Sequence, residues 1–338
     1  MKKTSARFIW ISVGLLCIAK PNNLISWGFL AHQTINKKAI LGLPEPLLTF
    51  YSEHVQFLSD HAVDPDKRRY IDTSEAPKHY IDAERFGIKY ASDLAFWDSL
   101  PRKFSLAKEK FGPDFLHANG SVPWQIQKMM YGLIQAFKGG NQHQILQISA
   151  EIGHYIADAH VPLHTTENYD GQLTHQKGVH ALWETRIPEI SIENYLLIPS
   201  SAHYLPSPAD TIFQFLAEAH QLTPLVLAGE KTISGRIPEH ARYEFSPAKE
   251  SGKPIKSMSF YYVKSYENLM GMMVQIQMQK AIQQVANFWY TAWILAGQPS
   301  LPTEENSSNF NANTYSQPSE NQTNIDSTNT ESSSCSKN

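Results

Sequence analysis

The stretch His154-Tyr-Ile-Ala-Asp-Ala-His-Val-Pro-Leu-His164 places metal-binding side chains at helical spacing. His154 and Asp158 are four residues apart, so they share one face of a helix. His164 follows Pro162, which cannot continue the helix and therefore places this histidine on a turn. The stretch thus predicts a helix that ends in a turn and brings three ligands toward one point.

A second pair with the same spacing, His180 and Glu184, lies downstream in His180-Ala-Leu-Trp-Glu184. Zinc is bound by imidazole nitrogen and carboxylate oxygen as well as by thiolate, and this segment offers only the first two. One zinc ion takes three or four protein ligands, so the five ligands of residues 154–184 imply more than one ion. The sequence therefore predicts a zinc centre with several ions.

Helical periodicity dominates the remainder of the chain, and alternating strand patterns are scarce. We expect an all-α fold with a single multi-helix domain over residues 27–300. The last helix should break near Met270–Met273, and Gly229–Lys256, with its Gly, Pro and charged residues, predicts a long loop. The candidate helices are Ala31–Leu41, Pro46–Leu58, Ser92–Ser99, Pro123–Phe137, His143–Ala159, His180–Ile187, Thr211–Leu227 and Met258–Ala296.

The first 26 residues are typical of a secretory signal peptide. They combine a positively charged start, the apolar run Phe8–Ala19 and the small residue Ser26 just before Trp27. The apolar run is short for a membrane span. We expect a secreted or periplasmic protein, cleaved near Ser26/Trp27; a lasting membrane anchor, or a lipoprotein signal ending at Cys17, are the alternatives.

The composition predicts the character of the C-terminal end, the absence of disulfides in residues 27–300 and the kinds of partner to expect. Residues 301–338 are rich in Ser, Asn, Thr and Gln and are predicted to be a disordered tail. Both cysteines, Cys17 and Cys335, lie outside residues 27–300, so that part can form no disulfide. The net charge is −3, and no basic stripe or polybasic cluster marks a surface for nucleic acid or anionic membranes. We expect a monomer without a stable protein partner.

Further candidate ligands precede the central segment. They are His32 in Trp27-Gly-Phe-Leu-Ala-His32, Asp64 in Asp64-Pro-Asp-Lys-Arg, and His79 in His79-Tyr-Ile-Asp. These residues come before His154-x3-Asp158-x5-His164 and His180-x3-Glu184. The whole series has the same order as the metal ligands of a known family. From Trp27 to Gly297 the chain resembles the phospholipase C/P1 nuclease superfamily of trizinc phosphodiesterases.

That resemblance implies a site with three Zn²⁺ ions and assigns the ligands to them. The first ion would be held by Asp64, His79, His154 and Asp158. The second would be held by the free amine and carbonyl oxygen of Trp27, by His32 and by Asp158, which bridges the two. The third, more open ion would be held by His164, His180 and Glu184. The resemblance further implies hydrolysis by a metal-activated water that Asp64 orients or deprotonates, with no covalent intermediate.

Some features favour a nuclease. His79 is followed by Tyr80, Ile81 and Asp82, as in the S1/P1 nucleases. The resemblance implies that Tyr80 stacks on a base and Asp82 binds the edge of that base. The alternative is that Tyr80 packs against the metal site and Asp82 orients a ligand histidine.

Other features favour a phospholipase C. The last ligand is Glu184, as in the bacterial phospholipases C, and the linker 165–175 lacks the Asn/Gly-rich sequence of the nucleases. However, Leu30 and Pro65 stand where the choline-binding enzymes carry Glu and Tyr, so choline specificity is not expected.

We therefore expect a secreted zinc-dependent phosphodiester hydrolase. The first interpretation is an S1/P1-like nuclease acting on single-stranded nucleic acid or nucleotide esters, and the alternative is a phospholipase C acting on phospholipid head groups. A third is a catalytically idle zinc-binding relative, which a missing ligand would indicate; none is missing from the pattern.

Overall fold

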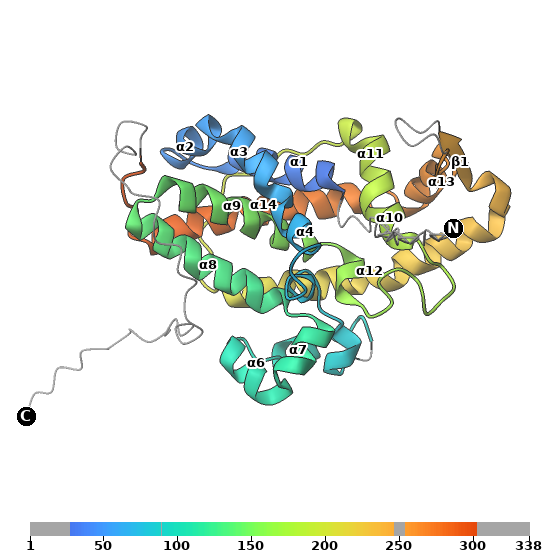
Figure 1. The fold of residues 1–338 in the computed structure, drawn as a ribbon, viewed down its shortest axis with the longest axis horizontal. Helices are drawn as coiled ribbons and strands as arrows, with labels where there is room; N and C mark the ends of the chain where they lie inside the picture. Colours follow the sequence, from blue (N-terminus) through green and yellow to red (C-terminus); the bar gives the residue numbers. More distant parts are fainter. Residues whose placement is uncertain (1–27, 89, 247–253, 303–338) are drawn as a thin grey trace, which may run out of the picture.

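The computed structural model describes residues 28–88, 90–246 and 254–302. Trp27, the predicted signal peptide and residues 303–338 of the predicted tail lie outside these ranges. The described part confirms the all-α prediction, since one two-stranded antiparallel sheet accompanies the helices (Figure 1). The longer helices are α1 (Phe29–Ala39), α8 (Val122–Gly139), α9 (Gln142–Asp158), α12 (Pro208–Arg236), α13 (Phe260–Met270) and α14 (Met273–Leu295).

Shorter elements connect these helices. They are α2 (Leu47–Glu53), α3 (Val55–Asp60), α4 (Asp64–Arg68), α5 (Leu94–Ser99), α6 (Phe104–Phe111), α7 (Pro113–Asn119), α10 (Val179–Ala181), α11 (Ile187–Ser191), β1 (Tyr243–Ser246) and β2 (Ile255–Met258). A π-helical turn, Leu182–Arg186, joins α10 to α11, and several 3₁₀ turns complete the chain. Tyr243 of β1 pairs with Met258 of β2. Among the described residues no helix is long and apolar enough to span a membrane.

Helix α9 lies at the centre of the core, where it packs against α1, α8 and α14 (Figure 1). It begins at Asn141, whose side chain accepts a hydrogen bond from the backbone N–H of Gln144 at 3.0 Å. Its last seven residues, 152–158, are buried on every side. A helix that is enclosed all round belongs to the interior, so polar side chains on its last two turns must find partners inside the protein.

Close packing of α1 against α9 depends on Gly153. The amide of buried Asn36 on α1 donates to the carbonyl oxygens of Leu58 and Ala150, at 3.2 and 3.0 Å. A Cβ atom at position 153 would lie 2.0 Å from the Asn36 side-chain oxygen, so only glycine fits there. This contact brings α1 close to the residue that follows Gly153, which is His154.

Two expectations for the C-terminal half have different outcomes. The predicted break of the last helix is confirmed: α13 ends at Met270 and α14 begins at Met273, with Gly271 at φ +61° between them. The predicted loop at Gly229–Lys256 is wrong, because α12 continues to Arg236 and β1 and β2 follow. Gly229 lies inside α12 and does not end it. A Cβ atom at this position would lie 2.0 Å from the Met270 methyl carbon, so glycine here leaves room for Met270 to pack against the helix.

Candidate metal centre

Five buried side chains from α1, α4, α9 and the turn before Tyr80 converge at the end of α9. We name them the inner cluster; they are His32, Asp66, His79, His154 and Asp158, each at most 4% exposed. Within it, His32, His154 and Asp158 form one possible metal-binding group and Asp66, His79 and His154 form another, with the ligand atoms of each group within 4.8 Å of one another.

Asp158 connects the two groups of the inner cluster. Its Oδ2 lies 2.8 Å from His79 Nδ1 and 3.2 Å from His154 Nε2. Its Oδ1 lies 3.5 Å from His32 Nε2. Because its two oxygens face different histidines, this carboxylate has the geometry of a bridging ligand.

A second group lies on shorter elements and is partly open to solvent. We name it the rim cluster; it consists of His164 on the 3₁₀ turn Pro162–Thr165, His180 on α10, and Glu184 on the π-helical turn. Glu184 is fully buried and faces both rings, at 3.3 Å from His164 Nε2 and 2.7 Å from His180 Nε2. The His180 side chain is 15% exposed.

Backbone carbonyls set the orientation of three of these histidines. The Nδ1 atoms of His154, His164 and His180 lie 2.9, 2.8 and 3.1 Å from carbonyl oxygens, those of Ala62, His79 and Tyr169 respectively. A ring that donates from Nδ1 to a carbonyl keeps the lone pair on Nε2. The Nε2 atoms of all three rings face carboxylate oxygens of their clusters.

The structure places Asp66 in the inner cluster, and not Asp64, which was the ligand predicted from the sequence. Asp66 Oδ1 lies 3.9 Å from both His79 Nδ1 and His154 Nε2. The Asp64 carboxylate instead contacts His61 Nδ1 at 2.5 Å and Lys67 Nζ at 2.9 Å, and it is 22% exposed. Residues two apart on a helix point about 200° from each other, so Asp64 and Asp66 of α4 cannot both face the cluster.

One sequence signal distinguishes the two aspartates. Ala62 lies four residues before Asp66 and is fully buried, and its carbonyl oxygen holds His154. Because residues four apart share a helix face, Asp66 lies on the same buried face as Ala62. Asp64 lies between that face and the solvent. The motif Asp64-Pro-Asp alone does not show which aspartate is on the buried face. The choice requires the preceding turn, which contains Ala62.

Burial and ion pairing act in opposite directions on the ligands. Burial raises the pKa of Asp158, but His154 and His164 hold it well below its usual value. Burial lowers the pKa of His164, but Asp158 and Glu184 raise it to about 9. A histidine must be neutral to bind a metal, so loading this site releases protons.

The side chains present fit zinc. The donors are imidazole nitrogens and carboxylate oxygens, which zinc accepts at three- and four-ligand sites. Asp66 Oδ2 is buried and has no hydrogen-bond donor among the described residues. An unsatisfied buried carboxylate oxygen is costly, and a cation at this place would remove that cost.

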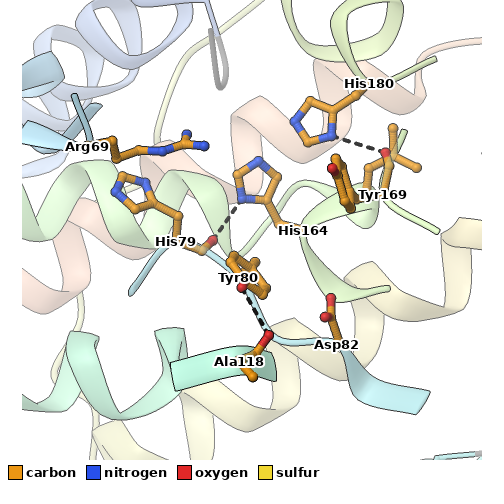
Figure 2. Close-up of a pocket in the computed structure, with 9 residues that line it drawn as sticks. Arg69, His79, Tyr80, Asp82, Ala118, His164, Tyr169 and His180 are labelled. Carbon is orange, nitrogen blue, oxygen red and sulfur yellow. Dashed lines mark hydrogen bonds between the residues drawn. The ribbon is translucent and has the colours of Figure 1, made fainter. Parts of the chain in front are cut away.

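A pocket of about 340 Å³ opens over the candidate metal ligands, and Figure 2 shows its lining. His79, His164 and His180 form one side. Tyr80, whose hydroxyl donates to the carbonyl oxygen of Ala118 at 3.3 Å, lies opposite with Asp82. The sequence-predicted substrate residues Tyr80 and Asp82 therefore share a pocket with the ligand histidines.

Sequence reasoning missed two polar side chains of this pocket, Arg69 and Tyr169. Arg69 lies beside His79 (Figure 2). Its Nη1 is 3.4 Å from Asp66 Oδ1. Tyr169, in the linker before α10, packs edge-on against His180 at a ring separation of 5.9 Å. The only signal for Tyr169 is its position between His164 and His180, whereas Arg69 lies three residues after Asp66 on the same helical face.

The pocket wall around Asp82 is acidic. Burial, followed by the negative charges of Glu84 and Glu167, raises the pKa of Asp82 to about 7. Glu84 accepts hydrogen bonds from the Thr166 hydroxyl and the Glu167 amide, at 2.6 and 3.1 Å. Asp82 thus lies close to the start of the linker that carries Tyr169.

Trp27 lies outside the described residues, so its predicted ligand role is not tested. Its neighbour Gly28 donates a backbone hydrogen bond to the carbonyl oxygen of Glu184 at 3.2 Å. A Cβ atom at Gly28 would lie 2.9 Å from the Thr185 methyl carbon. The described chain therefore begins in close contact with the segment that carries a rim ligand.

Two histidines outside the motifs take no part in either cluster. His160 is buried, stacks on Phe215 with ring centroids 4.6 Å apart, and has a pKa lowered to about 4 by burial. His175 lies exposed in the linker.

Comparisons with known proteins are sparse. No family model matches the chain, and no curated protein matches it. Among solved structures, it is similar to the alpha-toxin isolated from avian strain SWCP of Clostridium perfringens, with a TM-score of 0.44 and 14% sequence identity. The match covers 80% of this chain and 64% of the toxin chain. At this similarity nothing of the toxin's activity is transferred to this chain.

Proposed function

We propose that this protein is a zinc-dependent phosphodiester hydrolase. The observation that carries the proposal is the Asp158 carboxylate, whose two oxygens face His79 and His32 separately within one buried cluster. Zinc at such a site supplies positive charge for a phosphodiester and activates water for attack. Arg69, in the adjoining pocket, adds a guanidinium that matches phosphate geometry.

Asp66 takes the catalytic role that the sequence assigned to Asp64. Its Oδ2 faces no donor among the described residues, so it is free to accept a proton or a hydrogen bond from an attacking water. Burial raises the pKa of Asp66 in the metal-free protein.

For the substrate we propose a phospholipid with a cationic or zwitterionic head group. Tyr80, Tyr169 and Asp82 surround the outer part of the pocket, and aromatic faces with a carboxylate favour a cation. Glu84 next to Asp82 adds negative charge, which disfavours a polyanionic strand, whereas Glu167 is paired with Arg85 at 2.7 Å. This head-group site would differ from the choline type, consistent with Leu30, which stands where the choline-binding enzymes carry Glu.

Single-stranded nucleic acid is the second candidate substrate, on one specific observation. The Tyr80 hydroxyl donates to the carbonyl oxygen of Ala118 at the pocket wall, which supports a role for its ring in stacking on a base. With a pKa of about 7, Asp82 is partly protonated near neutral pH and could donate to the edge of that base. Nothing in the comparisons adds to this nuclease interpretation.

The experiment is a turnover assay on zinc-loaded protein that begins at Trp27, with a chelator-treated control. One arm contains mixed phosphatidylcholine and phosphatidylethanolamine vesicles, the second single-stranded RNA and DNA, and the third a chromogenic phosphodiester. Release of phosphorylated head groups alone supports the first proposal, and cleavage of nucleic acid alone supports the second. Zinc-independent activity, or none on any substrate, would sink the hydrolase proposal.

We also propose that cleavage of a signal peptide frees the Trp27 amine as a zinc ligand. Gly28 lies against Glu184, so the described chain begins beside the candidate metal centre. An N-terminal extension should then weaken one ion selectively in a chelator titration. Equal zinc affinity with and without the extension would count against the amine ligand.

A further inference from the structure

Glu75 lies against the inner cluster without being one of its ligands. It is 1% exposed, and its Oε1 lies 3.6 Å from Nε2 of His79. His79 turns its other nitrogen, Nδ1, toward the cluster, 2.8 Å from Asp158 Oδ2. The His79 ring therefore stands between the Glu75 and Asp158 carboxylates.

His79 differs in this respect from the other oriented histidines. His154, His164 and His180 each place Nδ1 against a backbone carbonyl and turn Nε2 to the metal site. The His79 Nε2 atom has no hydrogen-bond partner within 3.5 Å among the described residues, and the Glu75 carboxylate faces it. If Nδ1 binds a metal, the remaining ring proton sits on Nε2 and points at Glu75.

The position of Glu75 is itself fixed by three donors. The Tyr155 hydroxyl donates to Oε1, while Lys78 Nζ and Arg68 Nε donate to Oε2 at 2.8 and 3.3 Å. Two parallel hydrogen bonds of 2.8 Å tie Arg68 to Glu151. Tyr155 and Glu151 belong to α9, the helix that also carries His154 and Asp158. This helix therefore fixes the position of the Glu75 carboxylate next to His79 as well.

We propose that Glu75 is a positioning residue that orients His79 and strengthens its bond to the metal of the inner cluster. A carboxylate that accepts the second ring N–H fixes both the tautomer and the ring plane, and makes the ligating nitrogen more basic. Arg68 and Lys78 compensate the charge of Glu75, so the carboxylate can stay ionised in this buried place. The inference rests on the proposed metal centre.

The test is Glu75→Gln in the zinc-loaded protein beginning at Trp27, with zinc retained against increasing chelator measured by mass spectrometry. The variant should lose affinity for one ion by about 10- to 100-fold and keep the others. Glu151→Gln is the matched control, because it removes the same charge from Arg68 but does not face His79; it should shift that ion much less. Unchanged affinity in Glu75→Gln, or the same loss in both variants, would overturn the proposal.

Tyr155→Phe provides a second test if Glu75→Gln does not fold. It removes one of the donors that hold Glu75 and keeps the buried ring, so it should weaken the same ion by a smaller factor. A Tyr155→Phe protein that retains all its zinc at wild-type chelator concentrations would contradict the proposal. Wild-type protein that retains no zinc would instead refute the metal centre itself.

Discussion

The inner and rim clusters use the same ligand chemistry but are built on different supports. The inner cluster takes His32 and both of its α9 ligands from helices that pack in the core, and all five of its side chains are at most 4% exposed. The rim cluster takes its ligands from a 3₁₀ turn, a three-residue helix and a π-helical turn. We infer that the inner cluster holds its ions rigidly and supplies positive charge. The rim cluster would leave a coordination position open for the substrate.

The largest effect should come from breaking the link within the inner cluster. Asp158→Asn removes the negative charge that faces histidines of both inner groups, so two ions should be lost and turnover should fall by about 10³-fold or more. Zinc content and turnover measure this directly, with Asp60→Asn as an exposed control. Retention of all zinc in Asp158→Asn would show that the carboxylate does not bridge.

A smaller but more discriminating effect should separate the two aspartates of α4. Asp66→Asn should lower turnover by about 10²-fold, because Asp66 faces the cluster and its free oxygen can accept a proton from water. Asp64→Asn should change turnover little, since its carboxylate contacts His61 and Lys67. A larger loss of turnover in Asp64→Asn than in Asp66→Asn would instead support Asp64, the residue assigned from the sequence.

At the rim, His180→Ala should remove one ion and leave the inner pair in place. Only His164 and Glu184 would remain, which is fewer than the three protein ligands of a catalytic zinc site. Metal analysis should find two tightly held ions, and turnover should fall by about 10- to 100-fold. His175→Ala in the exposed linker is the control, and loss of more than one ion in His180→Ala would show that the clusters are not independent.

The smallest effect concerns the acidic wall of the pocket. The pKa of Asp82 is raised to about 7 in the folded protein, above its value of about 4 in the unfolded chain. The folded state therefore binds more protons between these values, and stability falls as pH rises from about 4 through 7.

Asp82→Asn removes this ionisation. At pH 8 it should raise the free energy of unfolding by about 1–2 kcal/mol, a figure reduced for solvent screening because the carboxyl group is partly exposed. At pH 4 it should have little effect. Urea unfolding at both pH values measures the difference, with the exposed Asp98→Asn as control. A gain of equal size at both values would assign the effect to packing instead of charge.

Local periodicity made much of the fold and the site predictable. The i,i+4 pairs His154/Asp158 and His180/Glu184 lie in helical segments, and the structure brings each pair together. The break after Met270 was predictable because Gly271 can adopt a positive φ.

What failed depends on contacts between distant segments. Gly229 lies inside α12, where it leaves room for Met270 to pack closely, and the sequence alone does not reveal that contact. The choice of Asp66 over Asp64 depends on which face of α4 meets α9, which Asp64-Pro-Asp alone does not reveal. The Glu75 network likewise joins residues about 80 positions apart through Tyr155, and no local pattern marks it.

The most direct test of the two-cluster account is anomalous diffraction at the zinc edge from crystals of protein that begins at Trp27. The account predicts two peaks on either side of the Asp158 carboxylate, one of them beside Asp66, and a third peak between His164, His180 and Glu184. An absence of peaks in the inner cluster, or a peak beside Asp64, would contradict it.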